Sequence, residues 1–134
     1  MIVDKAKVLI VEDDAVLCML ASKMVEEMGH EVVGTVSSGE SALQQIPLLK
    51  PDILVSDIHL DGAIKGTELI KGLREAGNRM PAILFSGESD AETIQQIERE
   101  KGLYFLLKPI SFFDFKEAFE KLISLQNEIP HLDY

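Results

Sequence analysis

Val8-Leu9-Ile10-Val11-Glu12-Asp13-Asp14 is an apolar run of four residues that ends abruptly in three consecutive carboxylates. Four more short apolar runs follow along the chain, and most of them do not alternate with polar residues. They lie at 31–36, 53–55, 82–85 and 104–107. Strands of a parallel sheet that is covered on both faces have this composition. The sequence therefore predicts five parallel strands.

Helical patterns separate the predicted strands. After the first strand, apolar residues repeat at helical spacing, and Gly29 follows as a stop signal. The apolar face of this first helix consists of Leu17, Leu20, Ala21, Met24, Val25 and Met28. Segments 37–40 and 89–92 match the capping box that opens many helices.

Two further helices complete the pattern. One is predicted from about Thr67 to Glu75, ending before Gly77, and the other follows the fifth strand. The apolar face of the last helix consists of Phe115, Ala118, Phe119, Leu122 and Ile123. A strand and a helix thus alternate five times, which predicts a parallel α/β sheet with right-handed crossovers and helices on both faces.

Length and composition restrict the class of protein. The 134 residues suit a single domain, with a core at about 7–126 and a tail or the start of a linker at 127–134. The net charge of −10 disfavours direct binding to nucleic acid or an anionic membrane, and it suits a metal cation or a basic partner. A single cysteine, the lack of a signal-peptide pattern and the lack of a long apolar run together predict a cytoplasmic protein.

Residues that can do chemistry stand where four of the predicted strands end. Glu12-Asp13-Asp14 closes the first strand, Asp57 the third, Ser86 the fourth and Lys108 the fifth. Each is weak evidence alone, because an acidic residue after a strand often only caps a helix, a role that Asp14 fits. Ligands of open α/β sheets bind beyond the carboxyl ends of the strands. The joint placement therefore predicts one site at that edge.

These residue types suit phosphoryl transfer. Carboxylates held close together repel one another and persist best around a hard cation. Oxygen ligands in an incomplete protein cage suit Mg²⁺, which keeps several waters. An aspartate can act as a nucleophile and form an acyl phosphate, while a lysine and a metal balance the charge of the transferring group.

With these motifs in place, the sequence resembles the receiver domain of bacterial two-component response regulators. The resemblance extends from about Lys7 to Gln126. It rests on four stretches: Val8–Asp14, Pro51–Asp57, Ile83–Gly87 and Leu107–Pro109. It implies a flavodoxin-like, doubly wound sheet with strand order 2-1-3-4-5.

The resemblance also implies a role for each site residue. Asp57 would be the phosphoacceptor, and Asp13, Asp57 and Glu12, the last through water, would bind Mg²⁺. His59 would offer its backbone carbonyl to the metal. Ser86 and Lys108 would be catalytic, Ser86 and Phe105 would form the conformational switch, and the Lys108–Pro109 bond is a candidate for a cis peptide.

Three features depart from the common pattern of the family. Asp57 and Gly66 are nine positions apart, where the family usually has eight. Leu60-Asp61 replaces the usual Met-Pro, so the shape of the loop up to Gly66 is not predicted. The switch aromatic is Phe105 rather than the more common tyrosine, and it cannot form a hydrogen bond.

The leading hypothesis is a phosphoacceptor that takes a phosphoryl group from a histidine kinase or histidine phosphotransfer protein, as in a phosphorelay, and later loses it. It would be self-phosphorylating and self-dephosphorylating rather than an enzyme that turns over a small molecule. The signal would pass to a protein partner or a fused output domain, with dimerisation on phosphorylation as a further possibility.

Two alternatives stay open. A degenerate receiver would bind proteins independently of phosphorylation, but no site residue is missing. A different α/β enzyme would need another kind of turn after the first strand. A nucleotide binder would have a glycine-rich turn there, and a phosphatase of the haloacid dehalogenase type would have Asp-x-Asp. His59 could also be a phosphorelay histidine or a metal ligand, but the three histidines lack ligand spacing, and steric screening of the acyl phosphate is the preferred interpretation.

Overall fold

The computed structural model describes residues 5–60, 62–88 and 91–128, with the side chains of 126–128 excepted. Its five strands form one parallel sheet in the order β2-β1-β3-β4-β5, which confirms the predicted fold class. The strands are β1 (Lys7–Val11), β2 (Glu31–Val36), β3 (Ile53–Asp57), β4 (Ala82–Ser86) and β5 (Leu103–Leu107). Each predicted strand is present, with bounds that differ by at most two residues from those expected.

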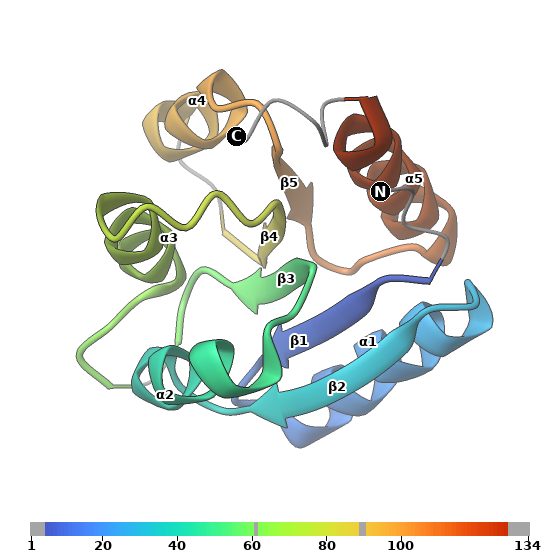
Figure 1. The fold of residues 1–134 in the computed structure, drawn as a ribbon, viewed down its shortest axis with the longest axis horizontal. Coiled ribbons are helices and arrows are strands. Elements are labelled where there is room, and N and C mark those ends of the chain that lie inside the picture. Colours follow the sequence, from blue (N-terminus) through green and yellow to red (C-terminus); the bar gives the residue numbers. More distant parts are fainter. Residues whose placement is uncertain (1–4, 61, 89–90, 129–134) are drawn as a thin grey trace.

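Helices cover both faces of the sheet. They are α1 (Ala15–Glu27), α2 (Gly39–Leu49), α3 (Gly66–Glu75), α4 (Ala91–Arg99) and α5 (Phe112–Glu128). Figure 1 shows α1 and α5 on one side of the sheet and α2, α3 and α4 on the other. Among the described residues, no helix is both long enough and apolar enough to cross a lipid bilayer.

The core has two layers because successive residues of a strand point to opposite faces. In β1, Val8 and Ile10 pack with the α1 and α5 side, whereas Leu9 and Val11 pack with the other side. All four are fully buried. Burial of each such side chain stabilises the fold by roughly 1.5–3 kcal/mol. This explains why β1 is continuously apolar from Val8 to Val11.

Helix α1 begins and ends as predicted. The Asp14 side chain accepts hydrogen bonds from the backbone N–H groups of Val16 and Leu17, so Asp14 is the N-cap. Gly29 has a φ of +87° just after the helix, a conformation that favours glycine. Asp14 is therefore a structural residue of the acidic turn.

The capping box predicted at 37–40 is wrong. The N-cap of α2 is Ser38, whose side chain accepts from the backbone N–H of Ser41. The third residue of the helix is thus a serine, and Glu40 is one position too early to complete the box. The capping box predicted at 89–92 begins outside the described residues.

Candidate functional site

The parallel sheet brings the predicted residues to one edge. Val11 pairs with Ser56, so Glu12 and Asp57 follow at neighbouring strand ends. Asp57 pairs with Phe85, and Ser86 pairs with Leu107, which places Ser86 and Lys108 along the same edge. Because all strands run in one direction, residues far apart in sequence meet there.

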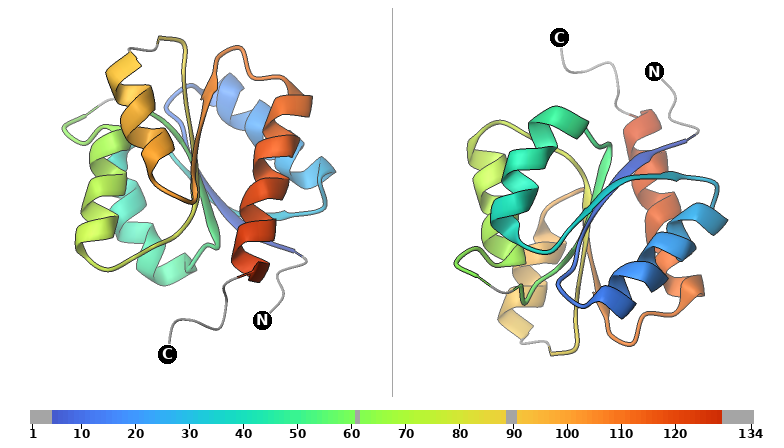
Figure 2. Two further views of the ribbon diagram at one scale, coloured as in Figure 1. Left: turned by 90° about the horizontal axis from the view of Figure 1, so that it is seen from above. Right: turned by 90° about the horizontal axis from the view of Figure 1, so that it is seen from below.

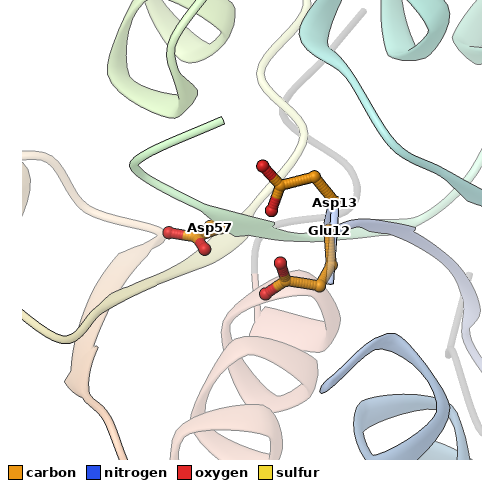
Figure 3. A group of neighbouring side chains, drawn as sticks. All are labelled: Glu12, Asp13 and Asp57. Carbon is orange, nitrogen blue, oxygen red and sulfur yellow. The ribbon is translucent and has the colours of Figure 1, made fainter. Parts of the chain in front are cut away.

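Three carboxylates form the centre of this edge. Glu12, Asp13 and Asp57 each offer one oxygen, and these oxygens lie within 4.8 Å of one another. Figure 3 shows Glu12 and Asp13 after β1 and Asp57 at the end of β3. Glu12 and Asp57 are only 3% and 4% exposed, while Asp13 is less buried. Such a buried cluster needs positive charge to balance it.

Lys108 supplies one positive charge. Its Nζ donates to Asp57 Oδ2 at 2.8 Å and to Glu12 Oε1 at 3.4 Å. The ammonium also lies 5.2 Å from the centre of the Phe85 ring, within the range of a cation–π contact. The lysine is thus oriented toward the carboxylates by three neighbours.

Burial and charge shift the pKa values of this cluster. Burial raises the pKa of Glu12 to about 7, although a hydrogen bond from the Asp14 backbone N–H opposes the shift. Burial alone would lower the pKa of Lys108, but its hydrogen bonds and charge attraction to Asp57 and Glu12 outweigh this and raise it. The lysine is therefore charged at neutral pH, whereas the Glu12 carboxyl changes its charge near pH 7.

Backbone and hydroxyl groups complete the surroundings of Asp57. The backbone N–H of His59 donates to Asp57 Oδ1 at 2.9 Å, while the His59 side chain is exposed. Ser86 is fully buried, and its Oγ accepts from the Glu88 backbone N–H at 3.0 Å. The Ser86 hydroxyl hydrogen can still donate to a further acceptor.

Phe105 stands apart from this cluster. It lies on β5, where it pairs with Leu84, and it is half-buried against the core on the α2, α3 and α4 side. The Lys108–Pro109 peptide bond is cis, as the resemblance of the sequence to receiver domains predicts.

The loop between β3 and α3 has a definite arrangement at the residues described. Leu60 is 1% exposed, and its carbonyl accepts from Lys65 Nζ at 2.9 Å. The Lys65 backbone N–H donates to Glu68 Oε1 at 3.0 Å, which fixes the start of α3. Asp61, the second residue of the Leu60-Asp61 departure, lies outside the described residues.

Two structural residues of the site escaped the sequence prediction. A Cβ built on Gly66 would lie 2.3 Å from the backbone oxygen of Asp57, so the start of α3 presses directly on the acceptor strand. Ser56 Oγ donates to that same oxygen at 2.9 Å. A glycine nine positions after Asp57 was the only sequence signal for the first contact, and nothing in the sequence indicated the second.

The donor set fits Mg²⁺. It consists only of carboxylate oxygens, which are hard ligands, and three protein groups leave room for the waters that Mg²⁺ retains. No cysteine belongs to the cluster, so it is a poor site for a soft metal.

Comparison with known proteins gives a consistent result. The family model of the response regulator receiver domain matches residues 8–120. The transcriptional regulatory protein PdtaR of Mycobacterium tuberculosis is 29% identical over 131 residues, which cover 95% of this chain and 61% of PdtaR. A protein-glutamate methylesterase/protein-glutamine glutaminase of Bacillus subtilis is 35% identical over 85 residues, covering 63% of this chain and 23% of that protein. The chain therefore spans less than two thirds of these curated relatives.

Solved structures show the same fold. The signal receiver domain of a modulated diguanylate cyclase from Desulfovibrio desulfuricans superimposes with a TM-score of 0.81 and 33% identity, covering 93% of this chain and 98% of that chain. The signal receiver domain of a LuxO repressor protein from Vibrio parahaemolyticus gives a TM-score of 0.86 at 19% identity, covering 97% and 98%. The second likeness concerns the fold alone.

Proposed function

This chain belongs to the response regulator receiver domain family, and we propose that it is a signalling switch whose phosphoacceptor is Asp57. The observation that carries the proposal is the 2.8 Å contact between Lys108 Nζ and Asp57 Oδ2 beside two further carboxylates. A nearly buried aspartate with a lysine already directed at it suits attack on phosphorus better than a structural role. The groups that the proposal needs are present at the ends of β1, β3, β4 and β5.

In the proposed transfer, an Asp57 carboxylate oxygen attacks the phosphorus of a phosphohistidine on a kinase or phosphotransfer protein. The O–P bond forms as the P–N bond breaks, and the electron pair leaves on the imidazole nitrogen. Lys108 would neutralise charge on the phosphoryl oxygens and on Asp57. The Ser86 hydroxyl would donate to a phosphoryl oxygen. Such positioning and charge balance are the main sources of rate in phosphoryl transfer.

Glu12, Asp13 and Asp57 would hold Mg²⁺, with the backbone carbonyl of His59 as a further ligand. When bound, the ion would balance negative charge on the transferring phosphoryl group. The Asp13 and Asp57 carboxylates would bind it directly, and Glu12 through water.

The proposed output is a change in the β4, β5 and α5 surface. Ser86 would follow the phosphoryl group, and Phe105 on the adjacent strand would adjust its side chain. The half-buried state of Phe105 supports this, because such a ring can become more or less buried. A downstream protein, a fused domain or a second phosphorylated copy would then bind this surface, and we expect the setting to be the cytoplasm.

A phosphorylation-independent binding module is the weaker alternative. It would need an incomplete site, whereas the acceptor, the acidic pair, the hydroxyl and the lysine are all present.

The acceptor is tested by incubation with acetyl phosphate and Mg²⁺, followed by intact mass measurement. One phosphoryl group, labile to hydroxylamine, is expected on the wild type and none on Asp57→Asn. Asp14→Asn is the matched control, because Asp14 caps α1 and asparagine caps equally well. Undiminished labelling of Asp57→Asn at another residue would sink the assignment.

A further inference from the structure

An apolar cavity of about 120 Å³ lies between α1 and α5, beneath the residues of the candidate site. Figure 2 shows α1 beside α5 on the same face of the sheet. Nine of the ten residues that line the cavity are apolar, and the tenth is Lys108. Helix α1 contributes Leu17, Ala21 and Met24 to its wall. The mechanism proposed above makes no use of this space.

The floor of the cavity offers little to water. It consists of Val55, Phe85 and Phe115, which are at most 1% exposed. The only charged group in the wall, the Lys108 ammonium, is already bound by Asp57 and Glu12. A buried water needs two to four polar partners, and cavities that lack them stay dry. An apolar occupant would therefore displace little bound water.

The size of the cavity defines the occupant. An engineered cavity of about 150 Å³, lined by similar side chains, binds benzene. The cavity here is slightly smaller, which suits one hydrocarbon ring. Leu20, which is 45% exposed, and the exposed Pro109 also line it, so it has an opening to solvent.

We propose that this cavity is a binding site for a small apolar molecule of about one hydrocarbon ring. The occupant would contact the methylene stem of Lys108 and the Phe85 ring, over which the ammonium lies. It would therefore touch Lys108, the partner of Asp57, and Phe85, one of the three neighbours that orient this lysine. The site does not depend on the proposed phosphoryl transfer, because its lining excludes all three carboxylates.

The test is a titration of the unphosphorylated, metal-free protein with benzene, followed by amide NMR. Saturable shifts are expected for amides of α1 and of residues 106–116. Ala21→Leu should fill the space and weaken benzene binding at least tenfold. Leu48→Ala is the control: Leu48 is 74% exposed on α2, and its removal should leave the benzene affinity unchanged.

Shifts that grow linearly without saturation, or that spread over exposed apolar residues, would overturn the proposal. So would unchanged affinity in a folded Ala21→Leu protein, with folding checked by circular dichroism. If that variant does not fold, Ala21→Val adds a smaller volume at the same position. An unaltered affinity of Ala21→Val for benzene would also overturn the proposal. Because neither metal nor phosphoryl donor is present, this result is independent of the acceptor test.

Discussion

Asp13 is the residue at which metal binding and repulsion between carboxylates can be separated. Its side chain forms a hydrogen bond with that of Glu12, a contact that raises the pKa of Glu12. In metal-free buffer these acidic groups are held together without the cation that suits them. Replacing Asp13 by asparagine removes one charge and provides an amide donor for Glu12.

We therefore predict that Asp13→Asn melts at a higher temperature than the wild type in EDTA. If Mg²⁺ binds with a dissociation constant of about 1 mM, ~10 mM metal adds about 1.4 kcal/mol to the unfolding free energy of the wild type. This corresponds to roughly 4–7 °C in melting temperature for a domain of this size. The shift should shrink in Asp13→Asn and persist in Asp14→Asn. A wild type without a Mg²⁺ shift, together with a less stable Asp13→Asn in EDTA, would exclude a metal site.

His30 gives the fold a dependence on pH that is separate from the site. Its Nδ1 accepts from the Ala6 backbone N–H at 3.0 Å, and its ring lies 4.8 Å from that of Phe119, between centroids. Burial lowers the pKa of His30 below its ordinary value of 6.5. The unfolded chain therefore binds a proton at higher pH than the folded one, and the stabilising neutral form is lost on acidification.

The prediction is that the free energy of unfolding falls as the pH drops from about 7 through 6.5 toward the lowered pKa, by at most ~1.4 kcal/mol per pH unit. His30→Asn keeps an acceptor for Ala6 and should flatten this fall. Urea unfolding at several pH values measures it, with His59→Asn as an exposed control. The raised pKa of Glu12 changes the free energy of unfolding with pH in the opposite direction. This contribution is the same in the wild type, His30→Asn and His59→Asn, so it cancels when they are compared. Equal pH dependence in wild type and His30→Asn would refute the role of His30.

The start of α3 is tied to the acceptor strand β3 by backbone contacts. The Gly66 backbone N–H donates to the Ile58 carbonyl at 2.8 Å, and a Cβ at Gly66 would collide with the Asp57 backbone. The atoms that a Cβ at Gly66 would meet belong to the backbone, so no flexible side chain could move aside. The helix and the acceptor are thus positioned together.

Gly66→Ala should therefore destabilise the fold by about 1–3 kcal/mol, the usual cost of overpacking, and should slow labelling of Asp57 by acetyl phosphate. Gly72→Ala in the same helix is the matched control, because an added Cβ meets nothing within 4 Å there. It should stabilise the fold by about 0.5–1 kcal/mol through helix propensity. Denaturant unfolding compares the two, and similar effects of both substitutions would contradict the close approach.

The proposed switch connects the site to the surface formed by β4, β5 and α5. Ser86 ends β4 at the site, while Phe105 lies two positions before the end of β5. Phosphorylation should favour one of two conformations already in equilibrium. We predict amide NMR shifts across the ends of β4 and β5, α4 and the start of α5. Asp57→Asn should show none on the same treatment, and shifts confined to α1 and α2 would count against this surface.

The sequence alone predicted the order of elements and the composition of the site. Continuous apolar runs such as Val8–Val11 indicate strands buried on both faces, and a carboxylate, hydroxyl or lysine follows four of them. These are local signals, because periodicity and strand-end position depend on residues close in the chain. The capping box at 37–40 failed because a shift of one residue changes which side chain can reach the first turn.

Only the tertiary structure decided the distances and environments. Lys108 and Asp57 are 51 positions apart, and their 2.8 Å contact exists because parallel strands β3, β4 and β5 end at one edge. The raised pKa of Glu12 depends on burial by several elements, and no local pattern records that. The apolar cavity is likewise a property of how α1 and α5 pack, since its lining comes from five separate segments. Local chemistry thus determined which groups the protein has, and packing determined which of them meet.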